Sequence, residues 1–162
     1  MVPRLENPDD VREAASYLRF PPEGVRGLAL LTRGAGLGEV GHTAIRDLND
    51  PILGIFQIES GAAVDNAAGL AAIDGVDVLF VGPTDLSHSL GIPGAFAERP
   101  YREALARVVD AVRAAGKAAG ILLRSPAEMA EYVDLGFTFV GLGSDASFVA
   151  QGAVAAVAAR PT

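Results

Sequence analysis

The clearest pattern along the chain is an alternation between short apolar runs and longer segments whose apolar residues recur at helical spacing. The apolar runs are nearly continuous, which is typical of strands buried on both faces of a parallel sheet. They are "ILGIFQI" at 52–58, "VDVLFVG" at 76–82, "AAGILL" at 118–123 and "FTFVGLG" at 137–143. The segments predicted as helices follow them at 61–72, 99–115, 126–135 and 146–158. This repeated order of strand and helix predicts the α/β class.

The N-terminal third of the chain is less regular. The residues "VPRLE" are typical of the tail end of a strand. Residues 7–20 are predicted as a helix, because Asn7 is a good N-cap and Pro8 suits the first helical position. The remaining stretches are the glycine-rich segment 28–50, with a short helix predicted near 43–49, and a long loop predicted over 82–98.

Two architectures contain repeated strand–helix units. One is an open sheet, and the other is a (β/α)₈ barrel of the TIM type; both bind ligands at the C-terminal ends of their strands. The spacing of strands and helices suits the barrel, but a whole barrel takes roughly 250 residues. The 162 residues supply about four and a half strand–helix units. We therefore expect either an open sheet or a single incomplete TIM-barrel domain that spans residues 1–162.

Composition and charge narrow the range of functions. The net charge of −7 argues against general binding to nucleic acids or anionic membranes. No apolar run approaches the ~20 residues that a membrane span needs. The chain has no cysteine, which excludes disulfides, thiolate nucleophiles and cysteine-ligated zinc. The first residues have no signal-peptide pattern, so a cytoplasmic location is the expectation.

Single carboxylates follow two consecutive predicted strands. Glu59 comes directly after the first strand and Asp85 follows the second. Consecutive parallel strands are usually neighbours, so both acids are expected at the same edge of the sheet. Carboxylate oxygens select a hard cation such as Mg²⁺ or Mn²⁺. The alternative is structural: Glu59 would cap the helix that begins near residue 61, and Asp85 would cap the turn after Pro83.

Residues beside the two acids suggest a ligand pocket. Gln57 lies two positions before Glu59 and therefore on the same strand face, where it either binds a ligand oxygen or is a core residue hydrogen-bonded to backbone. Gly82 and Pro83 let the backbone come close to a ligand. The amides of Thr84 and Asp85 are then placed to bind a carboxylate.

Five further features carry weaker signals. His88 is a candidate base or a loop residue, and His42 lies in the poorly defined segment. Arg33 is a candidate for contact with an anionic substrate, although a solvated surface position explains it as well. Lys117 precedes its strand, at the opposite end from the acids, which disfavours Schiff-base chemistry. The turn "GLGSD" at 141–145 either binds phosphate or allows tight packing.

The motifs together resemble the metal-dependent pyruvate aldolases of the HpcH/HpaI family. The resemblance runs along nearly the whole chain and is most specific in "GPTDLS" following "QIE" at this spacing. The segments that carry it are "VPRLENPDDVREA", "FPPEGVRG", "FQIES", "VDVLFVGPTDLSHSLGIPG", "GKAAGILL" and "GFTFVGLGSD". It implies a TIM barrel of which this chain is the C-terminal portion, from the end of strand 4 to helix 8.

The resemblance also implies roles for individual residues. Glu59 and Asp85 match the positions that bind the divalent metal, Mg²⁺ or Mn²⁺, and Gln57 with the amides of "GPTD" matches those that hold pyruvate. The implied reaction is cleavage of 4-hydroxy-2-oxo acids to pyruvate and an aldehyde through a metal-stabilised enolate. The family's proton-transfer His and its pyruvate-binding Arg match nothing in this chain, so the catalytic base is unknown.

Three functions follow as hypotheses. The first is a class II aldolase or lyase of 2-oxo acids, with its activity in this short chain left open. The second is an inactive half-barrel that acts as a binding or assembly module, and the third is an enzyme of the citramalyl- or malyl-CoA lyase type. Each hypothesis requires the exposed strand edges to be covered, by a homo-oligomer or by the missing N-terminal half.

Overall fold

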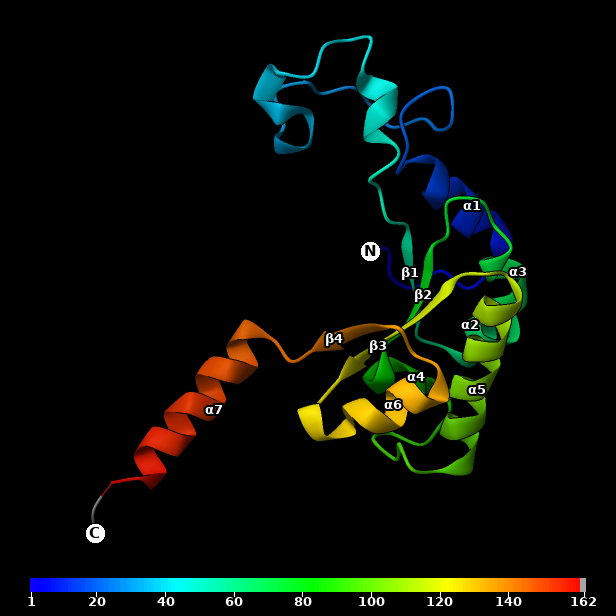
Figure 1. Cartoon of the computed structure of the whole chain (residues 1–162). Helices are drawn as coiled ribbons and strands as arrows, with labels where there is room; N and C mark the ends of the chain where they lie inside the picture. Colours follow the sequence, from blue (N-terminus) through cyan, green and yellow to red (C-terminus); the bar gives the residue numbers. More distant parts are fainter. Residues whose placement is uncertain (161–162) are drawn as a thin grey trace.

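A four-stranded parallel sheet organises the computed structural model, which describes residues 1–160 (Figure 1). The strands lie side by side in the order in which they occur along the chain. They are β1 (Ile55–Ile58), β2 (Val78–Val81), β3 (Ala118–Leu123) and β4 (Phe139–Leu142). Each lies within its predicted apolar run, so the α/β class with a parallel sheet is confirmed.

Helices connect the strands, and most begin close to the predicted positions. They are α1 (Pro8–Ser16), α2 (Gly61–Asp65), α3 (Ala67–Ala71), α4 (Pro83–Ser89), α5 (Arg99–Ala114), α6 (Met129–Leu135) and α7 (Asp145–Ala158). Short 3₁₀ turns are η1 (Arg33–Gly38), η2 (Ile45–Leu48) and η3 (Pro126–Glu128). The predicted helix 61–72 is divided into α2 and α3 at Asn66, and the short helix near 43–49 is the 3₁₀ turn η2.

The prediction of an uninterrupted loop over 82–98 is wrong. Its first part forms α4, with Gly82 as N-cap and Pro83 at the first helical position. Proline at this position is pre-organised for a helix, and Leu86 and Ser87 are buried where α4 packs on the domain. The short element therefore forms because packing stabilises it, although its sequence is rich in polar residues.

The first residues of the chain extend the sheet beyond β1. Val2 forms a parallel bridge with Phe56: its N–H donates to the Ile55 carbonyl at 2.8 Å, and its carbonyl accepts from the Gln57 N–H at 2.9 Å. Asn7 then caps α1 by accepting hydrogen bonds from the backbone N–H groups of Asp9 and Asp10. The N-cap is confirmed, and Val2 is the one residue of the predicted strand tail that pairs with the sheet.

The hydrophobic core lies between the sheet and one layer of helices. In Figure 1, α1, α2, α3 and α5 all lie on the same side of the sheet. The strand residues that face them alternate along each strand and are fully or almost fully buried: Phe56, Ile58, Leu79, Val81, Ala119, Ile121 and Leu123. The longest described helix, α5, packs against the sheet with Leu105, Val108 and Val109 buried.

The other face of the sheet carries no helical layer in the described residues. A row of residues in register crosses it: Gln57, Phe80, Gly120 and Phe139. The rings of Phe80 and Phe139 meet edge to face, with their centroids 6.1 Å apart. They meet over Gly120, where a Cβ atom would lie only 2.6 Å from the Phe80 ring. Further along, the side chain of Leu122 is 42% exposed.

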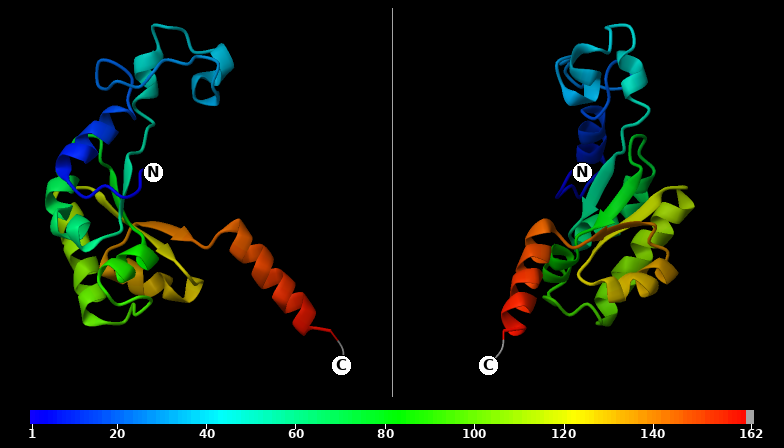
Figure 2. Two further views of the ribbon diagram at one scale, coloured as in Figure 1. Left: turned by 180° about the vertical axis from the view of Figure 1, so that it is seen from behind. Right: turned by 60° about the vertical axis from the view of Figure 1, so that its left-hand side comes forward.

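Two segments project away from the packed domain (Figure 2). The first contains η1 and η2 and connects α1 to β1; Leu28, Leu31 and Leu37 are exposed on it. The second is α7, in which no residue is buried and Phe148, Val149, Val154 and Val157 are all exposed. Among the described helices, none is both long enough and apolar enough to cross a membrane.

Candidate active site

A cavity of about 410 Å³ lies at the C-terminal end of the first two strands. Four segments form it: residues 4–6 after the bridge at Val2, the residues at the end of β1, the start of α2, and α4. Its lining residues are Arg4, Leu5, Glu6, Gln57, Glu59, Ser60, Ala63, Asp85, His88 and Ser89. The two acids of the predicted metal site therefore line one cavity, as the order of the strands predicts.

Glu59 is half-buried and is held from two sides. Its Oε2 atom accepts a hydrogen bond of 3.1 Å from the backbone N–H of Arg4. On the other side it packs against Gly82, where an added Cβ would approach Glu59 Cγ to 2.9 Å and Oε1 to 3.1 Å. The capping role considered for Glu59 belongs to Ser60, whose hydroxyl accepts from the Ala63 N–H at 3.1 Å. The second oxygen of Glu59, Oε1, has no hydrogen bond within residues 1–160 and can therefore bind a ligand.

Asp85 lies in the first turn of α4, and its side chain is exposed. No side chain caps this helix, and within residues 1–160 the Asp85 carboxylate has neither a hydrogen bond nor an ion pair. The structural alternative for Asp85, a cap on the turn after Pro83, is therefore not what the structure contains. First-turn N–H groups have no acceptor within their helix, so those of Thr84 and Asp85 remain able to donate.

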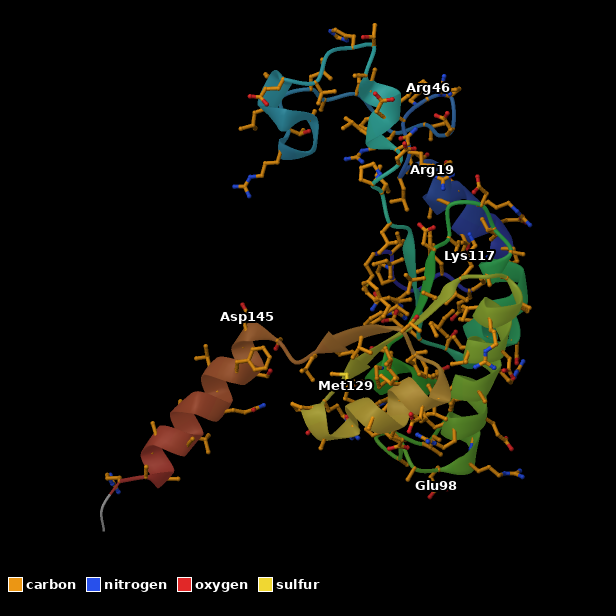
Figure 3. The ribbon with its side chains drawn as sticks, viewed as in Figure 1. Arg19, Arg46, Glu98, Lys117, Met129 and Asp145 are labelled. Carbon is orange, nitrogen blue, oxygen red and sulfur yellow. The ribbon has the colours of Figure 1, made fainter. Side chains whose placement is uncertain are left out.

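The other predicted site residues divide into two groups. Gln57 and His88 line the cavity, and His88 follows Asp85 by three positions, on the same side of α4. His42 and Arg33 lie on the projecting segment before β1 and do not reach the cavity within this chain. Lys117 lies at the start of β3, at the end of the sheet remote from the acids (Figure 3).

The turn at 141–145 is used to begin a helix. The hydroxyl of Ser144 accepts from the Ser147 N–H at 3.2 Å, and the Ser147 hydroxyl accepts from the Ser144 N–H at 2.9 Å. These two bonds form a reciprocal capping arrangement at the start of α7, which Asp145 opens (Figure 3). The glycine Gly143 has φ +62°, a conformation that glycine adopts without strain.

Arg4 and Glu6 line the cavity, although sequence reasoning did not single them out. The signal was present in the sequence. Val2 is the residue of "VPRLE" that bridges to β1, and it does so in parallel, so the residues after Val2 lie at the same edge as Glu59. The rule that selected Glu59 and Asp85, a polar residue just past a strand end, also selects Arg4 and Glu6.

The donor set of the cavity suits a hard divalent cation. Glu59 and Asp85 supply carboxylate oxygens, and Mg²⁺ is commonly held by one or two carboxylates, with water and substrate as its remaining ligands. Within residues 1–160 no group of three or more His, Cys, Asp or Glu side chains is close enough to hold a metal. A site closed by protein ligands alone is therefore not present, whereas a site open to substrate fits these residues.

Comparison with known proteins places this chain in a family. The profile of the HpcH/HpaI aldolase/citrate lyase family matches residues 1–152. The chain belongs to this family. It is 40% identical to a hydroxypyruvate/pyruvate aldolase of Delftia acidovorans over 156 residues, 96% of this chain and 58% of the relative. It is 36% identical to a 4-hydroxy-2-oxo-heptane-1,7-dioate aldolase of Salmonella typhimurium, over 98% of this chain and 60% of the relative.

Solved structures of other proteins share the fold. A crystal structure of an HpcH/HpaI aldolase/citrate lyase family protein from Burkholderia cenocepacia matches with a TM-score of 0.87 and 35% identity, over 96% of this chain and 62% of that one. The structure of the citrate synthase SbnG matches with a TM-score of 0.81 and 25% identity. The chain thus spans about three fifths of the length of these family members.

Proposed function

We propose that this chain is the metal-binding part of a carbon–carbon lyase that acts on 2-oxo acids. The reaction is the cleavage of a 4-hydroxy-2-oxo acid to pyruvate and an aldehyde. One observation carries the proposal: Glu59 and Asp85, from consecutive strand ends, line one cavity in a chain of the HpcH/HpaI family. The aldolase names of the relatives support it.

Residues of the cavity take separate roles in this proposal. Glu59 and Asp85 hold Mg²⁺ or Mn²⁺, and such a cation supplies Lewis-acid polarisation of the keto oxygen when bound. Gln57 donates a hydrogen bond from its amide to a substrate oxygen. The free N–H groups of Thr84 and Asp85 donate to the substrate carboxylate. Gly82 keeps Glu59 in place, because a larger residue would occupy the space of the Glu59 side chain.

In this proposal, a partner surface covers the exposed apolar side chains of the sheet and of α7. Leu122 is exposed on the face of the sheet without helices, and α7 leaves four large apolar side chains in solvent. Exposed apolar patches of this kind mark interaction surfaces. We therefore propose that the 162 residues form half of a TIM barrel, completed by a homo-oligomer or by further strands of the barrel. If copies of this chain complete the barrel, light scattering after gel filtration should give a mass above the 16.6 kDa of one chain; the mass of a single chain would favour the further strands.

The test of the proposed function begins with metal binding. Glu59→Gln and Asp85→Asn should each abolish Mn²⁺ binding in calorimetry while the far-UV circular dichroism stays that of the wild type. The control is Glu13→Gln, an exposed carboxylate on α1 outside the cavity, which should leave Mn²⁺ affinity unchanged. If metal affinity survived both cavity substitutions, the proposed metal site would be wrong.

Turnover is the second part of the test. Pyruvate release from 4-hydroxy-2-oxo acids is measured with Mn²⁺ and again after EDTA. Turnover that EDTA removes supports the lyase and means that the chain or its oligomer supplies a base. Metal binding by a folded chain without turnover would support the binding module instead.

A further inference from the structure

We propose that Arg4 binds a carboxylate of the 2-oxo acid at this site and so selects anionic over uncharged ligands. The inference rests on the proposed function, because it needs a 2-oxo acid in the cavity. It assigns a role to a side chain that lies outside the motif of the two acids.

The distribution of charge distinguishes Arg4 from the other arginines. Within residues 1–160, eight of the twelve arginines form ion pairs with carboxylates. Arg26 instead stacks on the ring of Phe20, 4.7 Å from its centroid. In the same part of the chain, neither Arg4 nor Arg33 has an ion pair, and Arg4 is the one Arg or Lys that lines the cavity of Glu59 and Asp85. A positive charge at this cavity is therefore available to a ligand.

The backbone of Arg4 is fixed close to the proposed metal ligand. Its φ angle is +57°, in the left-handed region that residues other than glycine rarely adopt. Its N–H donates to Glu59 Oε2 at 3.1 Å. Such conformations persist where the surrounding structure holds them, and they cluster at functional sites. The backbone of Arg4 is thus held beside the Glu59 carboxylate, while Arg4 itself is exposed and lines the cavity.

The chemistry of the guanidinium suits this position. In the proposed function, a divalent cation neutralises the negative charges of Glu59 and Asp85. The Arg4 guanidinium is then left to pair with a carboxylate of the ligand. Guanidinium and carboxylate groups match in shape and form two parallel charge-assisted hydrogen bonds. A ligand carboxylate next to the keto group and a second carboxylate further along the ligand offer the same chemistry, and the experiment distinguishes them.

The experiment measures ligand selectivity in the 162-residue chain loaded with Mn²⁺. Calorimetry gives the dissociation constants of two pairs of probes. Pyruvate against pyruvamide tests the carboxylate next to the keto group, and 2-oxoglutarate against 2-oxopentanoate tests a distal one. Arg4→Gln should reduce at least one of the two selectivity ratios by about tenfold or more, because a hydrogen-bonded charge pair is lost. The ratio that falls identifies which carboxylate Arg4 binds.

Three further variants separate charge from structure. Arg4→Gly fits the left-handed backbone, keeps the N–H that Glu59 accepts, and should lose the same selectivity. Arg4→Lys keeps the charge and should retain part of it. Lys117→Gln removes one positive charge at the opposite end of the sheet and should leave both ratios unchanged.

Each outcome decides the proposal. Unchanged ratios in both Arg4→Gln and Arg4→Gly, with normal Mn²⁺ binding, would overturn the role of Arg4 and leave the proposed function intact. If the wild-type chain bound neither Mn²⁺ nor pyruvate, the proposed function and the role of Arg4 would both be overturned. Selectivity that falls in both Arg4→Gln and Arg4→Gly, and not in Lys117→Gln, supports the role of Arg4.

Discussion

The two faces of the sheet differ in what covers them and in what they carry. The face toward α1, α2, α3 and α5 is apolar and buried throughout. The opposite face carries Gln57, two phenylalanines around Gly120, and the partly exposed Leu122. Glu59 and Gly82 continue this second face beyond the strand ends, because they follow Gln57 and Phe80 by two positions.

This difference separates the residues that stabilise the fold from those that form the site. Alternate residues of one strand point to opposite faces, so neighbours in the sequence can have different roles. The helix-covered face supplies the buried apolar area that drives folding. The open face leads to the cavity, where small residues and carboxylates take the place of large apolar side chains. Substitutions on the two faces should therefore have different consequences.

Ile121 and Leu122 in β3 make the sharpest test, because they are adjacent and face opposite ways. Ile121 is fully buried and Leu122 is 42% exposed. Ile121→Ala should lower the free energy of unfolding by about 2–5 kcal/mol, since it leaves a cavity in the core. Leu122→Ala should cost less than about 1 kcal/mol in the monomer. Urea unfolding at low protein concentration measures both; equal losses would mean that the open face is covered in solution.

Gly82 tests whether the open face controls ligand geometry. An added Cβ would lie 2.9 Å from Glu59 Cγ, and the flexible Glu59 side chain can move aside without disturbing the backbone. Gly82→Ala should therefore weaken Mn²⁺ binding by about tenfold to a hundredfold and change thermal stability little. The control is Gly41→Ala, at a position where nothing lies within 4 Å of the added Cβ. Unchanged Mn²⁺ affinity in Gly82→Ala would mean that Gly82 does not position Glu59 for metal binding.

The strands could be predicted from the sequence because burial on both faces leaves a continuous apolar run. The predicted run 118–123 coincides with β3. Helices that depend on packing were harder to predict: α4 is short and mostly polar, and of its buried residues Pro83, Leu86 and Ser87 only Leu86 is a large apolar side chain. The segment from η1 to η2 is held by specific contacts, such as Asn49, which accepts from the Phe20 N–H and donates to its carbonyl. Contacts of this kind leave no periodic signal.

The site could be predicted where strand order alone brings residues together. Glu59 and Asp85 follow consecutive strands, and both line the cavity. Arg33 and His42 lie in a segment whose path depends on tertiary contacts, so sequence could not tell that they stay away from the cavity in this chain. The charge of Arg4 was visible, but its freedom from ion pairs depends on where every other acid lies.

Glu128 provides the smallest expected effect and a contrast with Glu59. Both acids follow a strand in the sequence, but Glu128 lies in the turn η3 after β3, and its carboxylate is bound by residues of that same turn. It accepts from the backbone N–H groups of Arg124 and Ser125 at 3.1 and 3.3 Å and pairs with the Arg124 guanidinium. Burial raises the pKa of Glu128, but these hydrogen bonds and the Arg124 charge together bring that pKa below its ordinary value of 4.5.

The lowered pKa fixes the sign of the pH dependence. The folded chain favours ionised Glu128, so its stabilising contribution is fully present above pH 4.5 and is lost as the pH falls through the lower pKa of the folded state. Glu128→Gln keeps an acceptor for the backbone N–H groups but loses the charge pair with Arg124, so it should cost up to about 1 kcal/mol at neutral pH, and the difference from wild type should shrink in acid. Glu13→Gln, an exposed acid without an ion pair within residues 1–160, should show neither effect. A cost of Glu128→Gln that stayed constant with pH would mean that packing, and not the carboxylate charge, gives Glu128 its role.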